Sequence, residues 1–113
     1  MITIYHNPRC SKSREGLCFL EEKNIPHAVV KYLDSGLTIE ELTKIIDILK
    51  IRPIELVRTK EQIWKDNYKD KTLNDKDILK ILSENPKLIE RPIVTNGDKG
   101  VIARPFSKIN DLL

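Results

Sequence analysis

The sequence predicts an α/β fold with a mixed four-stranded sheet, flanking helices and a helical insertion. A strand, a helix and a second strand follow one another at the amino end, and a β-hairpin followed by a helix ends the chain. Between them lies a helix-rich stretch. A strand–helix–strand unit pairs its strands in parallel with a right-handed crossover, whereas a hairpin is antiparallel. The sheet should therefore contain both kinds of pairing.

The amino-terminal half supplies the parallel pair. Residues 2–5 are β-branched or aromatic and predict a short strand. Residues 11–23 are compatible with a helix, and residues 27–33 predict a second strand that ends in a turn at residues 34–36. The side chains expected to face the core from the helix are Leu17, Cys18 and Leu20.

The middle of the chain predicts a helical insertion at about residues 38–85. Residues 38–41, Thr-Ile-Glu-Glu, form a capping box, and apolar residues follow them at helical spacing. Residues 51–73 show no clean period, so short helical turns and loops are expected there. A further helix, capped by Asn74 or Asp75, should stop before Pro86 because the residue ahead of a proline is disfavoured in a helix.

The carboxyl end predicts a hairpin and a last helix. The apolar residues 92–95 and 100–103 flank an Asn-Gly-Asp-Lys turn, and Pro105 can occupy the first turn of a helix. The residues expected to face inward from that helix are Phe106, Ile109 and Leu112 or Leu113. This order of elements is that of thioredoxin-like, or glutaredoxin-like, folds. We therefore expect one domain over residues 1–113.

Composition is that of an ordinary globular protein. The 113 residues are 40% hydrophobic and 33% charged, and 20 basic against 17 acidic side chains give a formal charge of +3. No block of like charge suggests a nucleic-acid arm. The amino end lacks a signal-peptide pattern, and no segment reaches the roughly 20 apolar residues that span a bilayer. We expect a cytoplasmic monomer without membrane attachment, whose cysteines are reduced.

Cys10 is the first candidate for a functional residue. It lies where the loop after the first strand meets the predicted helix, and the free N–H groups at a helix amino terminus lower the pKa of a thiol. His6 and nearby basic residues such as Arg9 would favour the thiolate further if they lie close to it. The polar, basic surroundings favour a reactive thiol over a buried structural cysteine.

Spacing excludes several kinds of thiol chemistry. Position 13 is Ser, so the two-thiol C-x-x-C motif is absent, and Gly16 stands where a phosphatase-type C-x5-R loop needs arginine. Cys18 lies about 12 Å further along the same helix at 1.5 Å per residue, beyond the roughly 7 Å that a disulfide allows. Cys18 is expected to fill the core, and an external thiol must supply the second sulfur. The cysteines and histidines also lack zinc-finger spacing, and no metal is expected.

Three motifs resemble the glutaredoxin-coupled arsenate reductase family. They are YHNPRCSKSR at residues 5–14, ERPIV at residues 90–94 and ARP at residues 103–105, and the likeness covers nearly the full length. The family resemblance implies that Cys10 is the nucleophile, that His6 assists it, and that several residues hold the oxyanion. The expected substrate-binding residues are Ser13, Arg14, Arg58, Arg91 and Arg104.

The assignment of Arg58 to the substrate has alternatives. Arg58 lies in a segment without a regular apolar pattern, and Arg52 or Lys60 could take its role. The fold resemblance also implies that Pro92 follows a cis peptide bond beside the active thiol. Planar guanidinium groups suit arsenate, which is a tetrahedral dianion, because they bind paired oxygens and keep their charge.

The resemblance implies a mechanism with external reductants. The Cys10 thiolate attacks arsenic, water leaves, glutathione adds to the adduct, and arsenite departs before glutaredoxin clears the mixed disulfide. No bound cofactor is expected. Two alternatives stay open: an Spx-like transcriptional regulator, which Ser13 disfavours because it breaks the C-x-x-C switch of those proteins, and a glutathione-dependent thiol reductase with another substrate.

Overall fold

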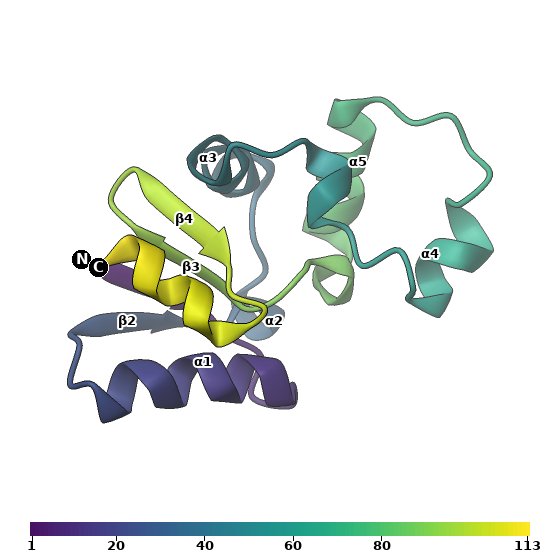
Figure 1. Ribbon diagram of the computed structural model, residues 1–113. Coiled ribbons are helices and arrows are strands. Elements are labelled where there is room, and N and C mark those ends of the chain that lie inside the picture. The colour runs from purple at the N-terminus through teal and green to yellow at the C-terminus, as the bar shows by residue number, and fades with distance from the viewer. The chain divides into compact units, whose positions relative to one another are not determined.

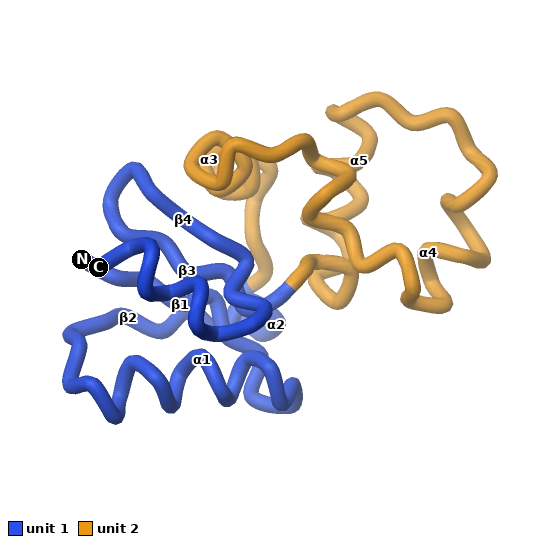
Figure 2. Tube along the Cα trace, viewed as in Figure 1, with its two compact units in different colours: residues 1–35, 91–113 blue, residues 36–90 orange.

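A mixed four-stranded sheet organises the computed structural model, which describes residues 1–113 (Figure 1). The chain divides into two compact units (Figure 2). Unit 1 comprises residues 1–35 and 91–113, and unit 2 comprises residues 36–90. Unit 1 holds the whole sheet, so its strands come from both ends of the chain.

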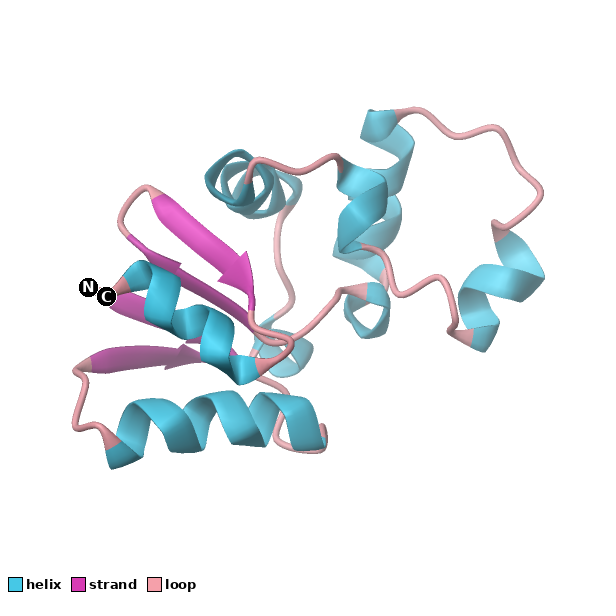
Figure 3. Ribbon diagram, viewed as in Figure 1, coloured by secondary structure: helices cyan, strands magenta, loops and turns pink.

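The sheet has the spatial order β2-β1-β3-β4 (Figure 3). Its strands are β1 (Ile2–Tyr5), β2 (His27–Val30), β3 (Ile93–Asn96) and β4 (Lys99–Ile102). β1 pairs in parallel with β2 and antiparallel with β3, and β3 pairs antiparallel with β4. The mixed sheet predicted from the sequence is therefore confirmed.

Two helices cover one face of this sheet. They are α1 (Ser11–Glu22) and the 3-10 helix η3 (Phe106–Leu112), which contact each other. Alternation along β1 turns Ile2 and Ile4 into the core beneath them, because successive strand residues point to opposite faces. The buried core of this face is formed by Ile2, Ile4, Phe19, Leu20, Val94, Ala103, Ile109 and Leu112.

The second strand is shorter than the sequence predicts. It ends at Val30, whose carbonyl oxygen accepts a hydrogen bond from the His6 N–H at 2.8 Å. The chain then turns into the short helix α2 (Tyr32–Ser35), because the N–H groups of Asp34 and Ser35 both bond to the Lys31 carbonyl oxygen. The predicted continuation of the strand to residue 33 is wrong.

The last helix is a 3-10 helix whose period of three brings residues 106, 109 and 112 onto one face. Ile109 and Leu112 are buried as predicted, whereas Phe106 at the rim is 39% exposed. The Phe106 ring still packs on Phe19, with centroids 5.5 Å apart. The expectation that Phe106 faces fully inward is therefore wrong, because it lies at the end of the helix beyond the sheet core.

The hairpin turn is tighter than the four residues assigned to it. Asn96 and Lys99 already belong to the strands, so only Gly97 and Asp98 form the loop. Gly97 adopts φ +64°, a conformation that glycine takes at little cost. The Asn96 side chain donates to the Leu112 carbonyl oxygen at 2.7 Å and ties the hairpin to η3.

Unit 2 is helical. Its elements are α3 (Ile39–Leu49), η1 (Pro53–Leu56), α4 (Gln62–Asn67), α5 (Asp75–Glu84) and η2 (Pro86–Leu88). The predicted capping box of Thr38 and Glu41 is present, and Asn74 caps α5 in the same way. α5 packs on α3, η1 and η2. No helix in the structure is long and apolar enough to cross a membrane.

Candidate functional site

Cys10 is the residue that caps the amino end of α1. Its backbone is extended, with φ −98° and ψ 124°, and its carbonyl oxygen accepts the first hydrogen bond of the helix from the Arg14 N–H at 3.0 Å. The first turn of α1 contains no acidic residue. The positive end of the helix dipole therefore faces the thiol without a competing carboxylate.

The loop that carries Cys10 is held by its own backbone and side chains. The Cys10 N–H donates to the Asn7 carbonyl oxygen at 3.0 Å, and the Arg9 N–H donates to Asn7 Oδ1 at 3.0 Å. Arg14 Nη1 donates to the Pro8 carbonyl oxygen at 2.9 Å. These bonds fix the thiol at the helix mouth, so the position of Cys10 does not depend on a flexible loop.

The surroundings of Cys10 favour its thiolate. Burial by itself would raise the pKa of the thiol, since Cys10 is only 9% exposed. The Ser13 N–H, the charge of Arg91, the Lys12 N–H and a hydrogen bond from the Arg91 side chain outweigh burial and lower the pKa of Cys10 below its usual value. A lowered pKa is what a helix amino terminus favours, and Arg91 is a second cause.

Arg91 is the most unusual charged residue of the site. Its Nε and Nη1 atoms are buried and have no hydrogen-bond partner. Buried donors without partners are rare and costly, which makes such a pair a natural place for an acceptor-rich ligand. A tetrahedral oxyanion beside Cys10 would satisfy both donors with two of its oxygens.

The backbone beside the thiol brings Arg91 into position. The Arg91–Pro92 peptide bond is cis, as the fold resemblance implies. Gly16 on α1 faces Pro92, and a Cβ at that position would lie 3.3 Å from Pro92 Cγ. The helix and the cis proline therefore approach closely because no side chain separates them, and Arg91 lies next to the mouth of the same helix.

The environment of His6 disfavours a positive charge on its imidazole. Its side chain is 4% exposed, and burial, together with the charges of Lys31 and Arg14, lowers its pKa. Its Nδ1 atom lies 2.6 Å from Ser13 Oγ. The imidazole is thus neutral near neutral pH, and its side chain bonds to Ser13 and not to the thiol.

Ser13 connects the loop to the helix. Its hydroxyl is fully buried, and Ser13 Oγ accepts a hydrogen bond from the Asn7 N–H at 2.9 Å in addition to its contact with His6. Its backbone N–H faces Cys10. The side chain, which the family resemblance assigns to substrate, is therefore already occupied within the loop. The sequence contained no signal for this role beyond the short spacing from His6.

The other expected anion-binding residues fall into both units. Arg104 is exposed in unit 1, and its neighbour Ala103 donates a backbone hydrogen bond to the Pro92 carbonyl oxygen at 2.8 Å. The Arg104–Pro105 bond is also cis, which the sequence analysis did not anticipate. Arg14 is exposed and bonded to the loop. The substrate roles of Arg14 and Arg104 stay predictions.

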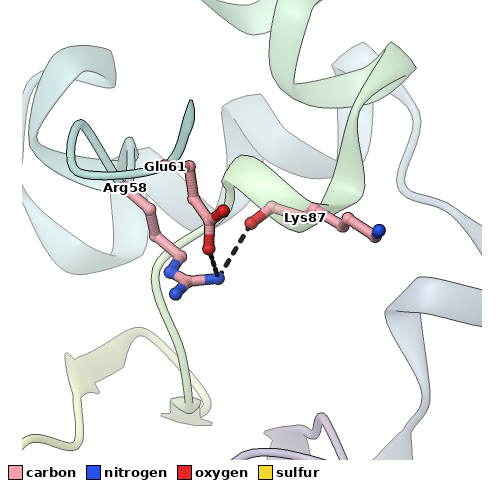
Figure 4. A network of polar contacts seen from close by, with 3 residues as sticks. All are labelled: Arg58, Glu61 and Lys87. Atoms are coloured by element: carbon pink, nitrogen blue, oxygen red, sulfur yellow. Dashed lines mark hydrogen bonds and ion pairs between the residues drawn. The ribbon is translucent and has the colours of Figure 1, made fainter. Parts of the chain in front are cut away.

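Arg58 lies in unit 2 and is held by residues of that unit (Figure 4). Its Nη1 atom is 2.7 Å from Glu61 Oε1 and donates to the Lys87 carbonyl oxygen at 3.2 Å. Its backbone N–H donates to the Leu88 carbonyl oxygen. All of these contacts lie within unit 2, and the substrate role of Arg58 stays a prediction.

Cys18 is an exposed free cysteine, not the core residue that the sequence analysis expected. The buried residues of α1 are Ser13, Gly16, Phe19 and Leu20, and Cys18 lies off this stripe. Cys18 lines a surface groove of about 410 Å³ between α1 and Phe106. Its assignment to the core is wrong, but Cys10 and Cys18 form no disulfide, as the helix geometry requires.

A mixed four-stranded sheet, a cysteine at the mouth of the first helix and a cis proline beside it define a thioredoxin-like thiol protein. The chain matches the ArsC family over residues 5–112 and belongs to that family.

Relatives and solved structures agree with this membership. The arsenate reductase of Haemophilus influenzae is 41% identical over 114 residues, covering 99% of this chain and 98% of its own. The arsenate reductase of Neisseria meningitidis serogroup A is 40% identical, with 99% and 97% covered. The structure of arsenate reductase from Vibrio cholerae superposes with a TM-score of 0.94 at 38% identity, covering 99% of this chain and 97% of that one.

Proposed function

We propose that the protein is an arsenate reductase that works through a Cys10 thiolate. The observation that carries the proposal is the pair of buried, unpartnered donors on Arg91 next to a thiol of lowered pKa. A nucleophile and a preorganised anion site side by side suit a reaction that attacks a tetrahedral oxyanion. The names of the two bacterial relatives and of the Vibrio cholerae structure support arsenate as that oxyanion.

The first step forms a sulfur–arsenic bond. The Cys10 thiolate attacks arsenic(V), and one arsenate oxygen leaves as water after taking up protons. Arg91 binds two of the remaining oxygens and offsets their charge, because its guanidinium cannot lose its proton. His6 acts as a positioning residue, since it is neutral and bonded to Ser13, which in turn directs its N–H at the thiol.

The second step reduces arsenic by two electrons. Glutathione thiolate supplies the second sulfur, each sulfur gives one electron, and arsenic leaves as arsenite. The Cys10–glutathione mixed disulfide that forms is then reduced by glutaredoxin. An external thiol is needed because Cys18 lies on the same helix, eight residues from Cys10 and facing solvent. This chemistry needs no bound cofactor and belongs in the cytoplasm, where the glutathione pool is reducing.

A coupled assay tests the proposal. Arsenate-dependent NADPH oxidation is followed in the presence of glutathione, glutathione reductase and glutaredoxin. The unaltered protein should turn over, Cys10→Ser should lose activity to background, and the matched variant Cys18→Ser should keep near-normal activity. Turnover by Cys10→Ser, or loss in Cys18→Ser, would contradict the mechanism. If Cys10 reacts fully with thiol reagents but arsenate is not turned over, the protein would be a thiol reductase with another substrate or an Spx-like regulator.

A further inference from the structure

Unit 2 contains a second hollow, of about 270 Å³, that has no part in the thiol chemistry. It lies among the segment before η1, the helix α4, the loop that follows α4 and the start of α5. All of its lining residues belong to unit 2. The hollow therefore exists within one compact unit.

The floor of this hollow is apolar and aromatic. Trp64 and Ile78 line it and are 6% and 5% exposed, and Ile54 and Leu73 add half-buried apolar surface. The rings of Trp64 and Tyr68 lie 5.5 Å apart with a tilt of 40°. An apolar floor with aromatic walls suits a flat ring, because it offers both surface to bury and ring edges to pack against.

The backbone holds the aromatic wall and the following lysines in place. The N–H groups of Tyr68 and Lys69 both donate to the Trp64 carbonyl oxygen, at 2.9 and 3.0 Å. The Lys71 N–H donates to the Tyr68 carbonyl oxygen at 3.1 Å. The loop after α4 thus continues as a defined turn that brings its basic side chains to the rim of the hollow.

The rim carries an excess of positive charge. Arg52, Lys69 and Lys71 line the hollow, and none of them forms an ion pair. Lys71 Nζ lies 5.7 Å from the centre of the Tyr68 ring, which places its charge over the aromatic wall. Asp75 is the one carboxylate of the lining. Asp75 therefore offsets only part of the positive charge at the rim.

We propose that this hollow is a binding site for a small organic anion in which a flat ring carries a carboxylate or a phosphate. The ring would pack on Trp64 and Tyr68, and the anionic group would meet Lys69, Lys71 and Arg52 at the rim. The volume is slightly below the roughly 300 Å³ at which ligand pockets usually begin, so the ligand has one ring system rather than two.

Trp64 makes the site directly observable, because it is the only tryptophan of the chain. The full-length protein is titrated with phenylacetate and with phenyl phosphate while Trp64 fluorescence is recorded. Each has a neutral counterpart, phenylacetamide and phenol. A saturable change is expected with at least one anion and a much weaker one with its neutral counterpart, and the stronger anion identifies carboxylate or phosphate as the preferred group. Failure of both anions, or equal binding of the neutral compounds, would overturn the proposal.

Charge variants locate the binding. The double variant Lys69→Gln, Lys71→Gln should bind the anion about tenfold more weakly or worse, because two charge-assisted contacts are lost. The matched control Lys44→Gln, Lys80→Gln removes two exposed lysines of the same unit and should bind normally. Circular dichroism verifies that both variants fold. Equal affinity of the two double variants would refute the site.

Discussion

Replacing Arg91 by methionine should separate activity from stability. Methionine keeps an unbranched apolar stem but removes Nε and Nη1, the two buried donors without partners. Loss of a single preorganised oxyanion donor costs about 10²–10³ in kcat, equivalent to about 3–4 kcal/mol of transition-state stabilisation. We therefore expect kcat/KM for arsenate to fall about 10²- to 10³-fold in Arg91→Met.

The thermal stability of Arg91→Met should stay the same or rise. An unsatisfied buried donor costs the folded state about 1–3 kcal/mol, and methionine removes two of them. Arg91→Met should thus unfold at the same temperature as the unaltered protein or above it. Arg91→Lys should lie between the two in activity, because lysine keeps a charge but loses the planar fork.

The assay combines steady-state kinetics on arsenate with thermal unfolding followed by circular dichroism. Lys99→Met, at the exposed tip of the hairpin, is the control for removal of a positive charge from unit 1. A variant Arg91→Met that keeps its kcat/KM would refute the anion site. A variant that loses activity only because it unfolds would contradict a stability cost of the unpartnered Arg91 donors.

Two further predictions concern the residues behind the thiol. Ser13→Ala should lower the free energy of unfolding by about 1–3 kcal/mol, because it leaves the His6 ring and the Asn7 N–H without their buried partner. Urea unfolding measures this free energy, and an unchanged value would contradict the hydrogen bonds of Ser13 to His6 and Asn7. Stability should also depend on pH through His6, whose pKa is lowered in the folded state, so that the unfolded chain binds the extra proton first. The melting temperature should therefore fall as pH drops below about 6.5. In His6→Asn this fall should be smaller, and an identical fall would contradict a buried neutral imidazole.

Local patterns in the sequence were sufficient for most of the fold. Alternation, capping residues and the Asn-Gly pair predict the parallel strands, the helix from Thr38 and the hairpin, because each signal is complete within a few residues. The end of β2 was missed because the side chains after Val30 remain strand-like, whereas the N–H groups of Asp34 and Ser35 bond to the Lys31 carbonyl oxygen and turn the chain into α2. The exposure of Phe106 was missed because the edge of a core depends on tertiary packing.

Part of the candidate site could also be predicted from local patterns. The position of Cys10 at the amino end of a helix follows from neighbouring residues, and so does the lowering of its pKa by that helix. The contacts of Ser13 with His6 and Asn7 are close in sequence, but they depend on how the loop folds back on the helix. The unpartnered donors of Arg91 depend on packing between segments about 80 residues apart, which no local pattern reports. Cys18 was misplaced because a small shift of the helical stripe decides whether a residue at its edge is buried or exposed.

Titration of the Cys10 thiol is the most direct test of whether the helix mouth and Arg91 stabilise its thiolate. In the variant Cys18→Ser, Cys10 is the only thiol, and its ionisation can be followed by thiolate absorbance in the ultraviolet. We expect an inflection below the usual cysteine pKa of about 8.5, and a shift of that inflection to higher pH when Arg91→Met is added. An inflection at or above the usual value, or one that does not move in Arg91→Met, would contradict a thiolate stabilised by the helix and by Arg91.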